Sequence, residues 1–336
     1  MSGAATPWAA RFMPVCNGVL DTVFTADELG ALALSIALPP GRGTNALIDL
    51  LKARGANVAA LDFDEGIFPP ARADKAHVVL GFKPEFEQCV AQPDVNTVWG
   101  ATLAQDAALG DVRAVHLGKS DLRAHFEDYS GAGQAGVMTF LDITNLQLAG
   151  RSALVLGFDT KARGVAACAR ALGAQVSVVD DDPRALVMAV ARGYAAQDIK
   201  LALPGADIIL CVTRGALQTL LERIEVLQPG AFVVNVADDA YHDFLGRFAS
   251  IEPLRESVHA CRCTDGKSIR VIAGARPLAD APDGLPLECL DVVFALHLCA
   301  LRQILDTNAA PPQVTPLEAK YEKAVAEILL SRHRRS

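Results

Sequence analysis

Residues 152–180 read SALVLGFDTKARGVAACARALGAQVSVVD, a pattern that predicts a Rossmann unit. An apolar strand (152–157) runs into a glycine-opened turn, and an alanine-rich helix (164–172) follows. A second strand (175–180) then ends in an acid. This strand–turn–helix–strand order favours a parallel sheet with a ligand site at the turn.

The turn lacks two of the three glycines typical of a dinucleotide-binding turn. One such glycine makes the tight turn, a second lets the backbone approach the pyrophosphate, and a third allows close helix–strand packing. Gly157 holds the first place, but Asp159 and Ala162 hold the others. At about 4 Å from a phosphate, two like charges repel by about 1 kcal/mol in water and by several at a lower effective dielectric. Lys161 or Arg163 would offset this repulsion, unless the turn is simply empty. The helix amides are available to an anion, unless Asp159 itself occupies them as a cap.

Asp180 is the strongest candidate in this stretch for binding a cofactor. It follows Gly157 near the spacing at which an acid binds the ribose diol of a dinucleotide. The alternative is a surface acid in the run 180–182. Three carboxylates would repel a 2′-phosphate, so NAD is expected rather than NADP.

Composition excludes several classes of protein. The 336 residues suffice for two domains, and 51% hydrophobic with 6% aromatic residues is typical of α/β layers rich in Ala, Leu and Val. A net charge of −8 argues against sequence-independent nucleic-acid binding. No apolar run reaches the roughly 18–20 residues that span a bilayer, and the first residues make a poor secretory signal. We expect a soluble, cytoplasmic protein without a membrane or nucleic-acid partner.

The cysteines do not predict a metal site. Most of the eight lie inside apolar helix or strand patterns, which indicates reduced structural thiols, with redox or metal roles as the alternative. Cys261 and Cys263 share one face of a strand, yet no second Cys/His pair follows at zinc-finger spacing.

Apolar runs that alternate with helical patterns predict a second sheet and an α/β fold class. In the first part of the chain the expected strands are 32–38, 57–62, 76–81, 96–100 and 112–116, with Thr44 as the N-cap of the first helix. In the second part they are 206–213, 231–237 and a hairpin with Asp265-Gly266 at its tip; the expected helices are 135–149, 183–193, 216–227, 287–305 and 317–331, with a hinge at 310–316. We expect two domains, a substrate-type α/β domain (1–134 and 286–336) and a Rossmann-like cofactor domain (135–285).

Four segments, in order, resemble the S-adenosylhomocysteine hydrolase family. They are GAGQAGVMTFLDITNLQLAGRSALVLG (131–157), VVDDDPRALVMAVARGY (178–194), LPLECLDVVFALHLCAL (285–301) and LEAKYEKAVAEILL (317–330). The resemblance implies a substrate domain, then a cofactor domain, with the last helices crossing back to the first. It also implies tightly bound NAD, oxidation of a ribose 3′-hydroxyl, and elimination or addition at C5′.

The chain departs from this family where the family places its chemistry. The family's catalytic Lys falls at Arg123, its Asp at Glu127, and the neighbouring Asn at Asp128. A family His falls at Asp238, another falls at Leu285, and the family's C-terminal tail has no counterpart. Arginine stays protonated in proteins, so it cannot replace a lysine base. Adenosylhomocysteine hydrolysis is therefore not expected.

Two groups of residues are candidates for catalysis. Arg123, His125, Glu127 and Asp128 form a polar cluster before a glycine-rich turn, although a solvated face is the alternative. Asp238 and His242 follow a strand and could form an acid–base pair, unless His242 is simply a solvated histidine.

The candidates for cofactor binding gather at strand ends. Arg214 could clamp a carboxylate or a phosphate, or form a surface ion pair. The full set is Gly157, Asp159, Ala162, Asp180, Thr213, Arg214, Gly215 and Asn235.

Two hypotheses about function remain open. In the first, the protein is a divergent enzyme that binds NAD and acts on a small polar substrate in the interdomain cleft, by oxidoreductase or lyase-type chemistry. In the second, it is a non-catalytic homologue that binds a nucleotide or a protein partner. A homo-oligomer is expected in either case, with a dimer favoured.

Overall fold

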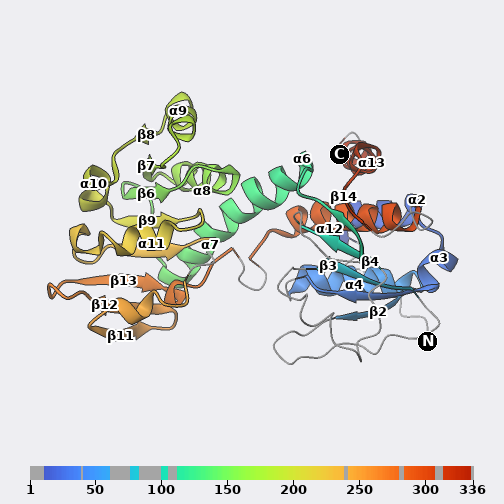
Figure 1. Ribbon diagram of the computed structural model, residues 1–336, viewed down its shortest axis with the longest axis horizontal. Helices are drawn as coiled ribbons and strands as arrows, with labels where there is room; N and C mark the ends of the chain where they lie inside the picture. Colours follow the sequence, from blue (N-terminus) through green and yellow to red (C-terminus); the bar gives the residue numbers. More distant parts are fainter. Residues whose placement is uncertain are drawn as a thin grey trace. The chain divides into compact units, whose positions relative to one another are not determined.

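The computed structural model describes residues 11–38, 41–60, 76–82, 100–104, 112–237, 241–279, 284–306 and 313–333. The chain forms two compact units (Figure 1). Unit 1 comprises Met1–Phe126 and Leu287–Ser336, and unit 2 comprises Glu127–Pro286. Among the described residues, no helix is both long and apolar enough to cross a membrane.

Unit 1 is built on a six-stranded parallel sheet in the order β14-β5-β4-β3-β1-β2. The strands are β1 (Leu32–Ile36), β2 (Asn57–Ala60), β3 (Ala76–Phe82), β4 (Gly100–Leu103), β5 (Arg113–His116) and β14 (Val314–Pro316). Strand β14 corrects the last part of the expected hinge at 310–316, of which residues 310–312 lie outside the described residues. Its backbone pairs with β5 at the edge of the sheet, where a terminal proline is tolerated because no further strand needs its missing N–H. Residues 96–99 of the fourth expected strand lie outside the described residues.

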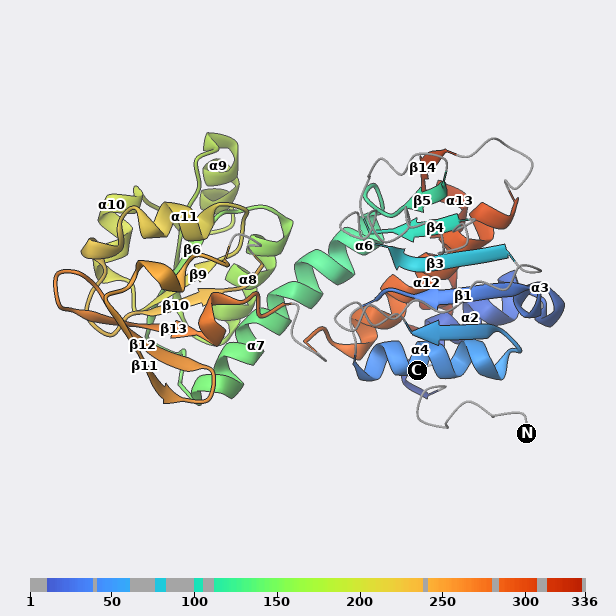
Figure 2. The same cartoon turned by 60° about the horizontal axis from the view of Figure 1, so that its bottom comes forward.

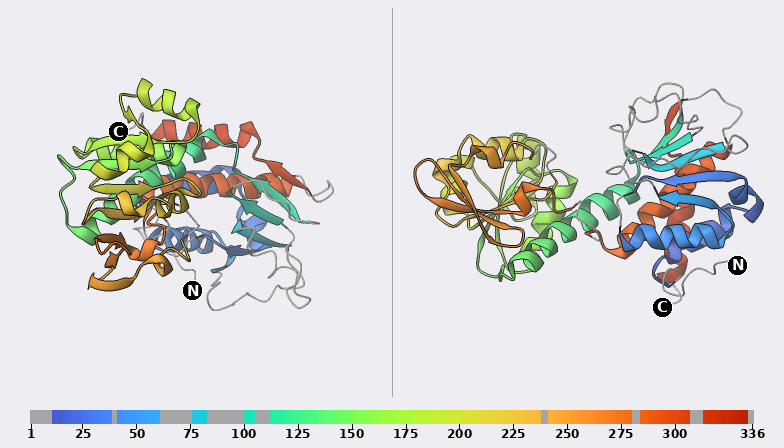
Figure 3. Two further views of the ribbon diagram at one scale, coloured as in Figure 1. Left: turned by 60° about the vertical axis from the view of Figure 1, so that its left-hand side comes forward. Right: turned by 90° about the horizontal axis from the view of Figure 1, so that it is seen from below.

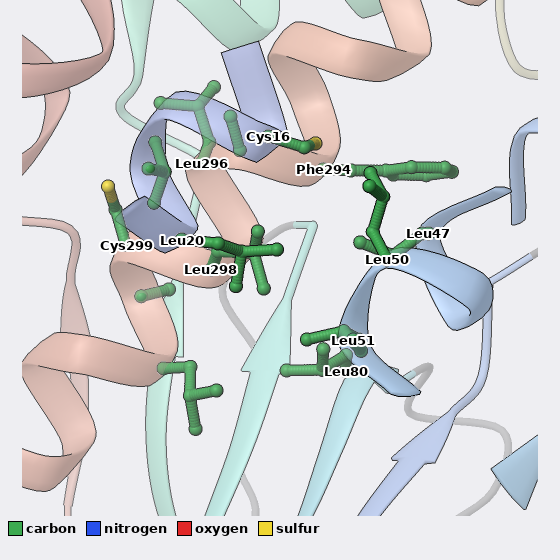
Figure 4. Close-up of a cluster of buried hydrophobic side chains, with 14 of the residues drawn as sticks. Cys16, Leu20, Leu47, Leu50, Leu51, Leu80, Phe294, Leu296, Leu298 and Cys299 are labelled. Atoms are coloured by element: carbon green, nitrogen blue, oxygen red, sulfur yellow. The ribbon is translucent and has the colours of Figure 1, made fainter. Parts of the chain in front are cut away.

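Helices from both ends of the chain complete the core of unit 1. They are α2 (Pro14–Val23), α3 (Ala26–Gly30), α4 (Arg42–Ala53), α6 (Asp121–Arg123), α12 (Leu287–Asp306) and α13 (Ala319–His333). Figure 4 shows Leu20 of α2 and Leu50 of α4 in one buried cluster with Phe294 and Leu298 of α12. The carboxylate of Asp291 also accepts hydrogen bonds from the N–H groups of Val15 and Cys16, which start α2.

The first turn of α4 differs from the sequence prediction. The helix begins at Arg42 after Gly41, and Thr44 is a buried helical residue instead of its N-cap. A Cβ on Gly43 would lie 2.6 Å from Cδ1 of Leu290, so α4 packs closely on α12 at this point. Packing against α12 therefore outweighs the capping preference of Thr44.

One continuous helical run carries the chain from unit 1 into unit 2 (Figure 3). It starts as α6, continues as a π-helix, η2 (Ala124–Ala132), and ends as α7 (Gly133–Thr144). The expected helix at 135–149 is thus the second half of a longer run. It stops early because Asn145 adopts the left-handed conformation (φ 50°) that ends many helices.

Unit 2 contains an eight-stranded sheet in the order β11-β12-β13-β10-β9-β6-β7-β8. Figure 2 labels six of its strands, from β11 to β6, in this order. The strands are β6 (Ser152–Leu156), β7 (Gln175–Val179), β8 (Ala195–Ala196), β9 (Ile208–Cys211), β10 (Phe232–Asn235), β11 (Ser250–Arg255), β12 (Val258–Arg262) and β13 (Ser268–Ile272). From β8 to β13 the strands are parallel, in the Rossmann order 3-2-1-4-5-6. Strand β12 is antiparallel to both of its neighbours, which forms the expected hairpin at Asp265-Gly266. The predicted α/β class with a Rossmann-type sheet is confirmed.

Alternate residues of the central strands of unit 2 enter two separate cores. On β6, Ala153 and Val155 join the cluster under α7, α8 (Thr160–Ala171) and α9 (Pro183–Ala191). Leu154 and Leu156 join the cluster under α10 (Ile199–Ala202) and α11 (Ala216–Leu221). This is the pattern expected of a sheet that helices cover on both faces, because successive side chains of a strand point in opposite directions.

Helices α7 and α8 touch at backbone level. A Cβ on Gly133 would lie 2.5 Å from the carbonyl carbon of Gly164, and a Cβ on Gly164 would lie 1.8 Å from the carbonyl oxygen of Tyr129. Neither atom can move aside as a flexible side chain would. The Gly164 position, which follows the dinucleotide turn, thus serves helix–helix packing.

We predict that Gly164→Ala lowers the free energy of unfolding of the full chain by about 2–3 kcal/mol or more, because the added methyl group forces two helix backbones apart. Gly205→Ala is the matched control: no heavy atom lies within 4 Å of its new Cβ. That variant should stay within about 0.5 kcal/mol of the wild type in urea unfolding. Equal stability of the two variants would contradict the close contact.

Candidate functional site

The turn after β6 admits only glycine at its first position. Gly157 has φ 98°, and its N–H donates to the carbonyl oxygen of Val179 at 2.8 Å. A Cβ at this position would lie 2.2 Å from Cγ2 of Thr213, which follows β9. Gly157 therefore brings the carboxyl ends of β6, β7 and β9 close together, at the switch point where α/β sheets bind ligands.

Asp180 directs its carboxylate at the backbone of this edge. Its Oδ2 accepts the N–H of Phe158 at 2.7 Å, and its Oδ1 accepts the N–H of Asp182 at 2.8 Å. Each carboxylate oxygen has two lone pairs, so each keeps one acceptor position for a ligand hydroxyl. The two hydrogen bonds from the backbone fix the orientation of the Asp180 carboxylate toward a ribose diol.

A hollow of about 260 Å³ lies beside Asp180. It is lined by Leu156, Gly157, Val179, Asp180, Asp181, Thr213, Arg214, Gly215, Ala216 and Thr219. Arg214 is exposed, and within the described ranges it makes no hydrogen bond or ion pair. No carboxylate among the described residues thus forms the alternative surface ion pair with Arg214, and its guanidinium remains available to a ligand.

Asp159 occupies the N-terminus of α8. It is the N-cap residue, and its Oδ1 accepts the N–H of Ala162 at 2.9 Å. Of the two cations expected to offset its charge, Lys161 lies with its Nζ 3.9 Å from Asp128, whereas Arg163 donates from Nε to the neutral carbonyl oxygen of Phe158 and keeps its charge near the turn. The structure therefore shows the capping alternative.

These residues fit one half of NAD and not the other. Gly157, Asp180 and the hollow suit an adenosine portion with its ribose diol. The pyrophosphate would have to approach the N-terminus of α8, where Asp159 already takes the amide of Ala162 and adds a negative charge. The turn thus offers a pyrophosphate one amide fewer and adds a like charge, which makes it a poorer anion site than a glycine turn.

The other predicted cofactor residues have structural contacts. Ala162 is fully buried in α8, and Gly215 (φ 82°) precedes α11 as its N-cap. The buried Asn235 donates from Nδ2 to the carbonyl oxygen of Ala275 at 2.7 Å. It thereby holds the turn Ala273–Ala275, whose three residues all have positive φ.

A second polar group lies in unit 1 near the carboxyl ends of β3 and β4. Oγ1 of Thr102 is 2.8 Å from Nδ1 of the buried His297, and it accepts the N–H of Gly81 at 3.0 Å. Arg123, which is 5% exposed, adds a nearby positive charge. Burial, followed by the charge of Arg123, lowers the pKa of His297 to about 3. His297 is therefore a neutral imidazole beside a fixed cation.

The predicted polar cluster, Arg123 to Asp128, is divided between the two units. Arg123 belongs to unit 1, whereas Glu127 and Asp128 lie in unit 2, on the π-helix. His125 is exposed and contacts Phe126 edge-on.

The predicted acid–base pair is only partly described. The ring of His242 is exposed and stacks on Tyr241 at 4.2 Å between centroids. Asp238 lies outside the described residues.

Sequence reasoning missed Thr102 and His297. The available signal was weak: His297 is the one histidine in the apolar run VVFALHLCAL, which on pattern alone indicates a core helix. Its partner Thr102 comes from a strand far away in the sequence, and only the fold brings the two together.

We predict that His297 makes stability depend on pH. In the unfolded chain the His297 ring binds a proton near pH 6.5, whereas in the folded chain it does so only near pH 3. The contribution of the neutral ring to stability is therefore fully present above pH 6.5 and is lost as pH falls toward 3. Between pH 7 and 5 the wild type should lose about 2 kcal/mol more unfolding free energy than His297→Asn, by proton linkage. Urea unfolding at both pH values measures this, and parallel losses would contradict the assignment. His77, whose pKa is also lowered by burial, is present in both proteins and cancels.

Comparisons with known proteins agree with the sequence resemblance. Residues 136–281 match the family model described as S-adenosyl-L-homocysteine hydrolase, NAD binding domain. An adenosylhomocysteinase of Pyrococcus abyssi is 28% identical over 96% of this chain and 88% of its own length. An S-inosyl-L-homocysteine hydrolase of Methanopyrus kandleri is 25% identical over the same shares of the two chains. A solved structure of dipicolinate synthase, A chain, from Bacillus subtilis is 13% identical with a TM-score of 0.48, covering 90% of this chain and 98% of the other. On these findings, residues 136–281 belong to the NAD-binding-domain family of S-adenosyl-L-homocysteine hydrolase, and the chain as a whole is similar to that family's enzymes at low identity.

Proposed function

We propose that unit 2 binds the adenosine portion of a nucleotide-type ligand in the hollow beside Asp180. The observation that carries this proposal is the pair of backbone bonds to Asp180, which hold its carboxylate at the hollow with acceptor positions to spare. The match of residues 136–281 to an NAD-binding domain supports the same site, with NAD as the cofactor that the family implies.

The remaining lining supports a nucleoside rather than a metal or an anion alone. Val179 and Ala216 give the hollow apolar surface, and Arg214 offers a planar cation at its rim. A guanidinium can stack on a purine ring or bind its acceptors.

Asp180→Asn should weaken binding of adenosine-bearing ligands about tenfold or more, because the carboxylate–diol bonds are charge-assisted and worth roughly 1.5–3 kcal/mol. The control is Asp265→Asn, which removes the same charge from the turn before β13, at the amino edge of the sheet and thus opposite the hollow. Denaturing the purified protein and analysing the supernatant by mass spectrometry identifies the ligand, and calorimetry measures the affinities. If both variants bind alike, Asp180 does not hold the ligand.

We further infer that unit 1 acts on a small polar substrate and that the protein does not hydrolyse adenosylhomocysteine. In favour of a reactive site, a neutral His297 and the buried Arg123 lie near two strand ends, where parallel sheets place their ligands. Against the family's own reaction, an arginine stands where the resemblance places the catalytic lysine, and a guanidinium does not release its proton.

We predict no detectable adenosylhomocysteine from adenosine and homocysteine in the presence of added NAD. A genuine adenosylhomocysteinase, assayed in parallel, provides the positive control. Turnover by this chain within a hundredfold of that enzyme would show that Arg123 and Glu127 can replace the family's lysine and aspartate, and would refute the proposal.

A further inference from the structure

We propose that the hollow beside Asp180 takes a purine nucleoside whose 5′ substituent carries no phosphate, and that Asp159 excludes the dinucleotide. This inference rests on the proposed function above, that the hollow holds an adenosine portion. It goes beyond that function because it specifies the kind of group attached to the 5′ carbon.

The first argument is the position of the Asp159 carboxylate. In the Rossmann arrangement, the 5′ substituent of the bound nucleoside leads from the ribose to the N-terminus of the helix after the first strand. That helix is α8, and its N-cap is Asp159, with Oδ1 on the N–H of Ala162. The protein thus supplies its own anion at the place of the pyrophosphate.

The second argument is that two cations around the turn already lie near carboxylates. Arg163 donates to the carbonyl oxygen of Phe158, and Lys161 lies near Asp128. Farther along, Arg184 pairs with Asp182 at 2.8 Å. Lys161 and Arg184 thus already have carboxylates nearby, whereas Arg163 keeps its charge beside a neutral carbonyl and Arg214 lines the hollow. A pyrophosphate at the N-terminus of α8 would meet the charge of Asp159 in competition with these cations.

The third argument is the size of the hollow. Sites that hold drug-sized ligands measure about 300–1,000 Å³, and this hollow measures about 260 Å³. It suits a nucleoside, with the diol on Asp180 and the purine against Val179 and Arg214. A dinucleotide would have to extend past Asp159.

These arguments also fix the charge of the 5′ group. A neutral group avoids the repulsion, and a positively charged group is attracted by Asp159. Ligands that share one nucleoside and differ only in 5′ charge therefore test the proposal directly.

The experiment is calorimetric titration of the full chain with 5′-amino-5′-deoxyadenosine, adenosine, AMP, ADP and NAD. We expect Kd to rise from the amino nucleoside through adenosine and AMP to ADP, by about tenfold or more from adenosine to ADP, since like charges about 4 Å apart repel by about 1 kcal/mol in water and more at a protein surface. NAD, whose pyrophosphate meets the same carboxylate, should also bind more weakly than adenosine. Asp159→Asn keeps an acceptor for the helix cap and removes the charge, so the ratio of ADP to adenosine Kd should fall about tenfold. Asp159→Ser provides a second neutral cap, and thermal unfolding checks that both variants are folded.

The control Asp265→Asn should keep the wild-type ratio, because its charge lies at the opposite edge of the sheet. If the wild type binds ADP or NAD as tightly as adenosine, the inference is overturned while the proposed function stands. An unchanged ratio in both Asp159 variants overturns it as well. If no nucleoside or nucleotide binds the wild type, the proposed function fails and this inference fails with it.

Discussion

The contact between the backbones of Gly133 and Gly164 is the constraint on which the ligand edge of unit 2 depends. It sets how closely α8 packs on α7, and α8 in turn fixes the turn that begins at Gly157. The cap at Asp159 and the approach of Thr213 to β6 both depend on that turn. A side chain at either helix contact would displace the helix, and the geometry at the carboxyl ends of the strands would change with it.

The charges at this edge have changed more than its shape. Gly157 still makes the tight turn, and Asp180 still ends the second strand with its oxygens turned to the turn amides. The substitution at Asp159 reverses the electrostatic preference of the helix terminus, which usually favours anions. The aspartate at this one helix cap thus disfavours phosphate at the N-terminus of α8, while Asp180 can still bind a ribose diol.

Periodic apolar runs predicted the fold well, whereas features that depend on distant contacts were missed. The alternation in β6 and the spacing of its turn are local, so the sequence predicted the Rossmann sheet directly. Strand β14 was interpreted as part of a hinge because the prolines in the sequence 310–316 outweighed the pairing with β5, which the sequence does not show. The π-helix Ala124–Ala132 has no periodic signature in the sequence. The candidate site divides in the same way: Asp180 was predicted from a motif, while Thr102 and His297 meet only through the fold.

The order of the units along the chain has a consequence for biosynthesis. Unit 2 is one uninterrupted stretch, so a ribosome releases all of it before α12 and α13 of unit 1 appear. Until then Leu20 and Leu50 lack the face of α12 that covers them, and α2 lacks the carboxylate of Asp291 at its first turn. The N-terminal segment of unit 1 therefore keeps part of its apolar surface exposed until the C-terminal segment with α12 and α13 has been synthesised. A nascent chain is most exposed to chaperones and proteases during this interval.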